Sequence, residues 1–450
     1  MKKRFAICST IVLLLLLSAC GAPQTLDFSY APEGEELSSL MVETSQTHRA
    51  ELEHVPSAAD FADAISDDPA SAGLLSESEV ESLLRGHAAM ETVSKEQAQS
   101  DVSLLFRTLQ SAYGAYEYFG QEKFDAAEDA VTQWLSSQND EIKVSALGEK
   151  LQESLAFMLA HDAHAVIYEP AAEEIEAQVR YEYFFADGFY FSKDVNGSYY
   201  MVNDGERWTL SSFSDEHVSV QPTLLKDGRI VYQPTLFALR KDAVQSSVTL
   251  KNPSGKAKIY RLDWTESQPL DVDLGTLDYR LIQEDGLTYV SLRSFVSGTY
   301  DNMLARYARE GAKARGSKAV IYDLRGNVGG SDSWPRKWIQ SFLGTQNSIE
   351  TSMLYAQKNS ALFAAENSES LLPEDEGTCF AREVHGTWYE NDIPIIVLVD
   401  DHCGSSGEGA VQLLKTLDNV LIVGSNTAGY QLCGNISTFT LPYTGIGVRF

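Results

Sequence analysis

The chain has 450 residues and is strongly acidic, with 64 Asp and Glu against 35 Lys and Arg and a formal net charge of −29. This length predicts two to three domains. So large an acidic excess argues against nucleic-acid binding, which needs Lys and Arg to neutralise phosphates, and it fits a protein kept soluble at a cell surface.

The start of the chain has the pattern of a secretory signal. Basic residues at 2–4 precede an apolar run at 11–17, which is too short to span a membrane as a helix. Small residues then lead to Cys20, an arrangement that resembles the bacterial lipobox, in which the cysteine becomes the lipidated N-terminus. We therefore predict a lipoprotein signal peptide over residues 1–20 and a chain anchored by lipid to the extracytoplasmic face of the cell membrane.

The next two segments differ in periodicity. Residues 21–94 are acidic and rich in Pro, Ser and Ala, which favours a mostly disordered tether with short helices such as one at 76–84. In residues 95–170, apolar residues recur at helical spacing, as Leu147 and Leu151 do, and they predict a helical N-terminal subdomain.

The remainder divides into a β-rich module and an α/β core. Residues 171–270 contain aromatic runs cut by hairpin-turn dipeptides such as Asn196-Gly197. In residues 271–450, predicted strands at 287–292 and 318–324 alternate with helical segments, which indicates a sheet flanked by helices.

Two stretches of this core carry a pattern suited to catalysis. Residues 318–330 form an apolar strand that ends in Asp-Leu-Arg-Gly-Asn-Val-Gly-Gly, and residues 393–408 form another that ends in Gly-Ser-Ser-Gly-Glu. Glycines let a turn aim N–H groups at a ligand, and Ser405 stands at the positive end of the next predicted helix. A nucleophile on one turn and oxyanion donors on another form the minimal arrangement for acyl transfer.

This pair of motifs, about 75 residues apart, resembles the C-terminal-processing (tail-specific) serine protease family, and in particular its tricorn-like and clostridial lipoprotein members. The similarity covers roughly residues 100–450 and is most specific over 287–450. It implies a ClpP/crotonase-like protease core and cleavage of peptides or protein tails through an acyl-enzyme.

In the family pattern the attacking serine lies three positions before the glutamate, which assigns it to Ser405. The other interpretation is that Ser405 or Ser406 only caps the following helix. Ser406 is a neighbouring candidate for attack, and its N–H is the natural oxyanion donor if Ser405 attacks. Gly329 and Gly330 are the oxyanion-loop candidates.

The base of this chain departs from the common family pattern. Many members use a lysine about 25 residues after the serine, where this chain has Tyr430. Tricorn-like members instead take a histidine from the helical region, and His164 resembles it, with His161 a weaker candidate. A histidine that simply ends a helix is the structural alternative. The residue that orients the imidazole stays unassigned, and we expect it beyond Phe450, where the chain stops within a predicted strand.

Other residues complete the predicted site. Asn426 and Thr427 lie on a loop expected to face it and are candidates for substrate binding. Cys403 and Cys433 lie on two loops near the serine, so a disulfide between them stays open, and Cys403 is a minor alternative nucleophile. The sequence contains no zinc-like ligand spacing and no phosphate-binding loop, so we predict no cofactor and no metal.

Two further functions remain open. The chain could be a catalytically inactive peptide-binding lipoprotein of the same fold, since the lysine is missing and no residue is assigned to orient the imidazole. A hydrolase of non-peptide acyl substrates is a weaker alternative, because one fold class hosts several acyl chemistries.

Overall fold

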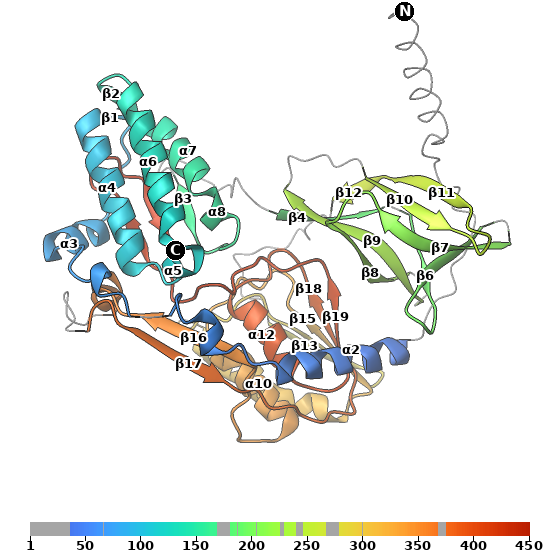
Figure 1. Ribbon diagram of the computed structural model, residues 1–450. Coiled ribbons are helices and arrows are strands. Elements are labelled where there is room, and N and C mark those ends of the chain that lie inside the picture. Colours follow the sequence, from blue (N-terminus) through green and yellow to red (C-terminus); the bar gives the residue numbers. More distant parts are fainter. Residues whose placement is uncertain are drawn as a thin grey trace, which may run out of the picture. The chain divides into compact units, whose positions relative to one another are not determined.

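The computed structural model describes residues 37–65, 67–168, 181–186, 188–203, 205–225, 229–239, 246–266, 279–298, 300–367 and 375–450 (Figure 1). The predicted signal peptide and Cys20 lie outside these residues. The chain divides into two compact units, residues 1–42 with 180–268 and residues 43–179 with 269–450. In the described part, no helix is both long enough and apolar enough to cross a bilayer.

The smaller unit is a pair of antiparallel sheets over residues 180–268, against an expected 171–270. One sheet has the order β11-β10-β7-β6-β5 and the other β12-β4-β9-β8. Aromatic side chains such as Trp208 and Phe191 form its core. Gly197 turns between β5 and β6 with a φ of 79°, as the Asn-Gly signal predicts. The strands are β4 Tyr181–Ala186, β5 Ser192–Lys193, β6 Tyr199–Asn203, β7 Glu206–Phe213, β8 Val218–Leu224, β9 Ile230–Leu239, β10 Ser246–Lys251, β11 Ala257–Leu262 and β12 Trp264–Glu266.

The first part of the larger unit is helical. Ser94 and Gln97 form a capping box that begins its longest helix, whose apolar residues are buried among those of the neighbouring helices. The elements are α2 Leu37–Glu53, which belongs to this unit from Glu43 on, η1 Ala58–Phe61, η2 Pro69–Ser71, α3 Glu77–Arg85, β1 Thr92–Ser94, α4 Lys95–Ala112, α5 Tyr116–Phe119, α6 Gln121–Ser137, β2 Glu141–Lys143, α7 Val144–Ser154, α8 Ala156–Leu159 and β3 Val166–Tyr168.

The second part is built on a sheet of order β13-β14-β15-β18-β19, in which the last four strands are parallel. Apolar side chains from these strands and from α9, α10 and α12 form one buried cluster. The elements are β13 Arg280–Glu284, β14 Leu287–Ser291, α9 Asp301–Glu310, η3 Gly311–Gly316, β15 Ala319–Asp323, α10 Ser333–Leu343, β16 Met353–Lys358, α11 Ala361–Glu366, β17 Cys379–Val384, β18 Ile395–Val399, α12 Ser406–Leu414, β19 Val420–Gly424, β20 Thr438–Thr440 and β21 Gly447–Arg449. The predicted α/β fold, with a helical N-terminal region and a β-rich middle module, is confirmed.

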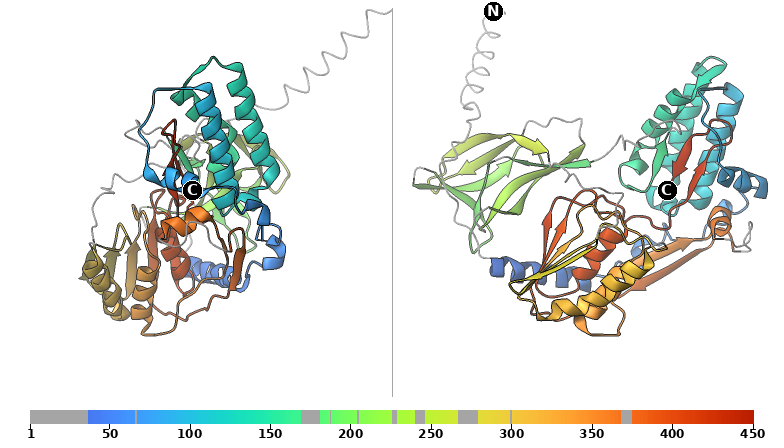
Figure 2. Two further views of the ribbon diagram at one scale, coloured as in Figure 1. Left: turned by 90° about the vertical axis from the view of Figure 1, so that its left-hand side faces the viewer. Right: turned by 180° about the vertical axis from the view of Figure 1, so that it is seen from behind.

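The helical region and the α/β core, expected as separate subdomains, belong to one unit. The end of the chain explains this, because β21 pairs with both β20 and β3, so that Arg449 lies opposite Val166. Figure 2 shows these last strands beside the helices of the N-terminal region. Phe439, Val448 and Phe450 are buried in the helical core.

One expectation is corrected. Residues 37–94, as far as they are described, do not form a mostly disordered tether: they include the 17-residue helix α2 as well as the expected short helix, α3. Polar contacts hold α2 on the core, because Ser45 accepts the Asn419 N–H at 2.9 Å and Glu51 pairs with Lys415. Composition did not reveal these contacts, since they form with residues more than 300 positions away.

Candidate active site

Ser405 stands on a strained turn between β18 and α12. Its backbone has φ 52° and ψ −122°, a region that side chains with a Cβ rarely adopt. The other non-glycine residues with positive φ in the described chain are Asp285, Asn419 and Asn435, whose side chains tolerate it better. Ser405 does occupy the N-cap position of α12, but an ordinary cap has extended dihedrals. Strain of this kind is typical of a nucleophile presented at a strand-to-helix turn.

The glycine turn after β15 lies directly against Ser405. Gly329 has a φ of 97°, and a Cβ placed on it would lie 2.6 Å from the Ser405 Cβ. Gly330 has a φ of 137°, and a Cβ there would lie 2.1 Å from the carbonyl carbon of Phe295. The Gly404 N–H donates to the Asn327 carbonyl at 2.9 Å and joins the two turns. The predicted juxtaposition of the glycine turn and the serine is therefore present.

The N–H groups of this turn are not equivalent. The Gly329 N–H donates to Asn327 Oδ1 at 3.0 Å, so it is already engaged. For the N–H groups of Gly330 and Ser406, the described residues supply no acceptor. The Ser406 N–H directly follows Ser405, and the Gly330 N–H lies on the turn that contacts Ser405 through Gly329, so both are candidates to bind an oxyanion.

A buried carboxylate stabilises the glycine turn from behind. Asp323 is fully buried and pairs with Arg325 at 2.8 Å and with Arg293 at 3.3 Å. Burial alone would raise the pKa of Asp323, but hydrogen bonds from Arg325, Tyr289 and Arg293 lower it to about 2. Asp323 and Arg325 thus have a structural role beside the glycine turn.

Glu408 organises the other side of the serine turn. Its buried carboxylate accepts the Thr427 hydroxyl at 2.6 Å and the N–H groups of Gly429 at 2.7 Å, Tyr430 at 2.8 Å and Ser405 at 3.1 Å. In the sequence, this glutamate served only to locate the serine three positions before it. Its spacing from the serine was the available signal, but its partners 19 to 22 positions later were not predictable.

His164 follows α8 and is 6% exposed. Its N–H donates to Asp162 Oδ1 at 3.0 Å and its carbonyl accepts from Arg449 Nε at 2.9 Å. Burial lowers the pKa of His164, although the charge of Asp162 and the backbone of Cys433 oppose the shift. The imidazole is therefore neutral near pH 7, as a general base must be. His161, by contrast, is exposed and its Nδ1 lies 2.9 Å from the Phe157 carbonyl.

Tyr430 connects the two halves of the site. Its ring stands edge-to-face against the His164 imidazole, with ring centroids 4.5 Å apart. It also packs on Gly404, because a Cβ there would lie 2.5 Å from Tyr430 Cδ2. His164 and the Ser405 turn thus share one neighbourhood, with Tyr430 touching both. Within the described part of the chain, no hydrogen bond joins His164 to Ser405.

The cysteines of this region are unpaired, and no disulfide joins Cys403 to Cys433. Cys403 lies beside Gly407, whereas the Cys433 thiol interacts with Asp162 and Tyr113. Burial raises the pKa of both thiols, so both are protonated near neutral pH. A protonated thiol is a weak nucleophile, which does not favour Cys403 as the attacking group.

Asn426 is exposed on the loop after β19, while the Thr427 hydroxyl is engaged by Glu408. Their role in substrate binding stays a prediction. Asp400, Asp401 and His402 are the one group of described residues close enough to share a metal, with atoms within 4.8 Å of one another. Asp400 already accepts the Gly326 N–H at 2.8 Å. The charge of Asp400 also raises the pKa of Arg325, after the larger effect of Asp323, and Asp400 Oδ2 is buried without a hydrogen-bond partner among the described residues.

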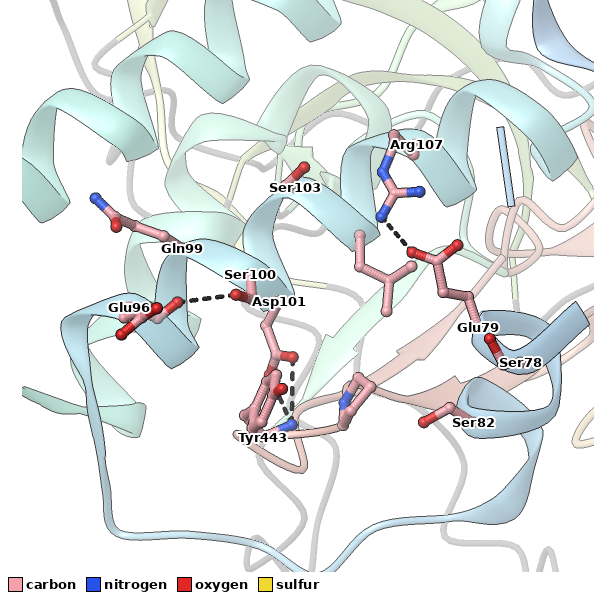
Figure 3. Close-up of a pocket in the computed structure, with 12 residues that line it drawn as sticks. Ser78, Glu79, Ser82, Glu96, Gln99, Ser100, Asp101, Ser103, Arg107 and Tyr443 are labelled. Atoms are coloured by element: carbon pink, nitrogen blue, oxygen red, sulfur yellow. Dashed lines mark hydrogen bonds and ion pairs between the residues drawn. The ribbon is translucent and has the colours of Figure 1, made fainter. Parts of the chain in front are cut away.

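A separate hollow of about 630 Å³ lies between α3, α4 and the loop at Tyr443 (Figure 3). Its charged groups bind one another: Arg107 pairs with Glu79, and Asp101 accepts the Tyr443 N–H. This hollow contains none of the residues of the Ser405 site.

Comparisons with known proteins give one family match and several solved structures. Residues 286–448 match the model of peptidase family S41, and this range includes the Gly329–Gly330 turn and Ser405. Among solved structures, mature CPAF complexed with lactacystin is 14% identical, with a TM-score of 0.39 and coverage of 79% of this chain and 89% of that one. A candidate peptidase from Parabacteroides merdae is 18% identical, with a TM-score of 0.38 and coverage of 80% and 82%. A lipoprotein from Streptococcus agalactiae is 14% identical, with a TM-score of 0.29 and coverage of 78% and 83%. No curated protein matches the chain.

Proposed function

We propose that this protein is a serine endopeptidase that cleaves peptides or protein tails through an acyl-enzyme on Ser405. The observation that carries the proposal is the contact between the strained Ser405 turn and the Gly329–Gly330 turn. The contact joins Ser405 and the unpartnered Ser406 N–H to the turn that carries the unpartnered Gly330 N–H, and the match to peptidase family S41 covers the same residues. No cofactor takes part in this proposal.

The reaction uses four groups. Ser405 Oγ attacks the substrate carbonyl while the neutral His164 imidazole takes the hydroxyl proton. The N–H groups of Gly330 and Ser406 stabilise the oxyanion, and the imidazolium then protonates the leaving amine. Water repeats the sequence on the acyl-enzyme and releases the acid. For direct proton transfer the Tyr430 ring must turn away from the imidazole, which an entering peptide could bring about by taking its place.

We further propose that the enzyme acts outside the cytoplasm, held to the membrane by a lipid on Cys20. The lipobox-like pattern before Cys20 supports this location, and the acidic net charge of −29 argues against nucleic acid as a partner. The substrates are then extracytoplasmic peptides or unfolded protein tails.

A fluorophosphonate probe tests the nucleophile, because it reacts with an activated serine. The full-length protein should be labelled and should cleave unstructured peptides, whereas Ser405→Ala should lose both properties. Ser406→Ala is the matched control: it keeps the backbone N–H and should retain labelling. Undiminished labelling of Ser405→Ala would overturn the assignment.

A catalytically inactive peptide-binding lipoprotein is the second candidate. It is favoured by Tyr430, which stands against His164 at the position of the family's lysine, and by the buried His164 Nδ1, which has no hydrogen-bond partner. Under this alternative, peptides bind to the wild-type protein without turnover, and Ser405→Ala leaves their affinity unchanged. Turnover that Ser405→Ala abolishes would reject it.

A further inference from the structure

Two buried polar side chains, Tyr113 and Asp162, form a cluster near His164 with the half-buried thiol of Cys433. Tyr113, at the C-terminal end of α4, donates its hydroxyl to Asp162 Oδ2 at 2.9 Å. The Cys433 thiol interacts with the same carboxylate and with Tyr113. Asp162 is fully buried, and its hydrogen-bond partners among the described residues are the Tyr113 hydroxyl and the His164 N–H, neither of which is a cation. A buried carboxylate without a cation costs stability unless hydrogen bonds satisfy it, so its retention beside His164 needs an explanation.

The cluster is coupled to the imidazole through the backbone. Asp162 Oδ1 accepts the N–H of His164 at 3.0 Å, and Arg449 donates to the carbonyl of the same residue at 2.9 Å. The backbone of His164 is thus hydrogen-bonded through both its N–H and its carbonyl group. The carboxylate does not bind the ring, because the His164 Nδ1 is buried and without a partner.

We infer that Asp162 is the positioning residue for the base: it fixes the backbone of His164 and supplies the negative charge that stabilises the imidazolium formed when Ser405 attacks. This inference rests on the proposed function. In a serine-histidine-aspartate triad the carboxylate performs this task through a hydrogen bond to the ring. Here it acts through the backbone and through space.

The charges around His164 set the direction of the effect. Burial lowers its pKa most strongly, and Arg449 from β21 lowers it further. The charge of Asp162 raises the pKa, as do the Cys433 backbone and the charge of Glu408 from α12. Tyr430 contributes the ring that covers the imidazole. Loss of the Asp162 charge must therefore lower the pKa of His164.

The donors of the cluster stay protonated. Burial, together with the charge of Asp162, raises the pKa of the Tyr113 hydroxyl and of the Cys433 thiol. Cys433 lies three residues after Tyr430, so the carboxylate also tethers the segment that carries the covering ring. The buried Asp162 carboxylate thus contacts both the backbone of His164 and the segment that carries Tyr430.

The test is an NMR titration of the His164 ring in the full-length chain, with its resonance assigned by comparison with His164→Gln. In Asp162→Asn the pKa of His164 should fall, and the acid limb of the pH profile of kcat/KM should move to lower pH by the same amount. We expect kcat to fall about tenfold with little change in KM. An unchanged pKa of His164 in folded Asp162→Asn would overturn the inference.

Tyr113→Phe is the matched control. It removes one hydrogen-bond donor to Asp162 but keeps the charge, so the pKa of His164 should rise. A fall like that in Asp162→Asn would show that any disturbance of the cluster lowers the pKa, and it would also overturn the inference. If Asp162→Asn does not fold, Tyr113→Phe alone tests the inference. With one hydrogen bond fewer, the negative charge of the Asp162 carboxylate is less neutralised and should raise the pKa of His164. The absence of a rise would count against the proposal.

The titration needs no turnover, so the two proposals can fail separately. A lowered pKa of His164 in a protein that never reacts at Ser405 would leave Asp162 as the group that sets the imidazole charge and would reject only the peptidase.

Discussion

The two halves of the candidate site are built in different ways. On the nucleophile side, the turn at Ser405 is held by Glu408 and lies against Gly329, all within the α/β core. On the base side, a helical region more than 200 residues earlier supplies His164, whose backbone is hydrogen-bonded at both ends but whose ring is covered by Tyr430 and has no hydrogen bond to Ser405. Under the proposed mechanism, the nucleophile side is preorganised for acyl transfer, whereas the base side must rearrange. The following predictions test this difference.

The largest effect should come from the oxyanion turn. Gly330→Ala places a Cβ about 2.1 Å from the Phe295 carbonyl carbon, so the turn must shift and misalign its N–H. Loss of one oxyanion donor costs about 10²–10³ in rate, and we expect that loss in the rate of fluorophosphonate labelling. Gly434→Ala, in open space, is the control and should react normally. A fully active Gly330→Ala would remove this turn from the mechanism.

The next largest effect should be on stability at the nucleophile side. Glu408→Gln replaces an acceptor oxygen by an amide NH₂ that faces N–H and O–H donors, such as those of Tyr430 and Thr427. We expect a loss of about 3 kcal/mol in the free energy of unfolding by urea. Glu122→Gln, exposed on α6, should cost less than about 0.5 kcal/mol. Equal costs for the two variants would contradict a preorganised serine turn.

Helix α2 gives a smaller effect that depends on pH. Burial, reinforced by Lys415 and opposed by Glu51, lowers the pKa of His48 to about 4. Below pH 6.5 His48 binds a proton in the unfolded chain but not in the folded chain. The free energy of unfolding therefore falls as the pH drops from 6.5 to about 4. The loss should be on the order of 2 kcal/mol.

His48→Gln should reduce this loss between pH 6.5 and 4, and His217→Gln, an exposed position in the other unit, should not. The free energy of unfolding at each pH measures both. If the two variants follow the same pH dependence, α2 is not packed as a part of the larger unit.

The smallest effect should come from Tyr430, on the base side. Tyr430→Ala uncovers the imidazole and reduces its desolvation, so the pKa of His164 should rise toward 6.5 and the acid limb of the labelling rate should move to higher pH. Labelling above pH 7 should become several-fold faster. Tyr430→Phe keeps the ring and should resemble the wild type. Slower labelling in Tyr430→Ala alone would mean that the ring assists the base instead of covering it.

The nucleophile side was largely predictable from the sequence. β-Branched runs bounded by glycines indicated β14, β15 and β18, and parallel strands leave their carboxyl ends at one edge, so the turns after β15 and β18 had to meet. The family resemblance then selected Ser405 from two adjacent serines. The ion pair between the buried Asp323 and Arg325 lies beside this turn.

The base side was less predictable because its contacts are long-range. His164 could be named only from the resemblance, and nothing local indicated that Tyr430 packs on it. Asp162 resembled any polar residue after a helix until Tyr113 and Cys433 surrounded it. Helix α2 was missed because its sequence is polar and its partners, such as Asn419, are distant.

The most direct test of the account is the pH dependence of fluorophosphonate labelling, with the adduct located by mass spectrometry, in the wild type and in His164→Gln. The account predicts an adduct on Ser405, a wild-type rate that rises to a plateau with a midpoint below pH 6.5, and a rate at least about 10²-fold lower without that midpoint in His164→Gln. An adduct on any other residue, or a His164→Gln variant that reacts at the wild-type rate, would contradict it.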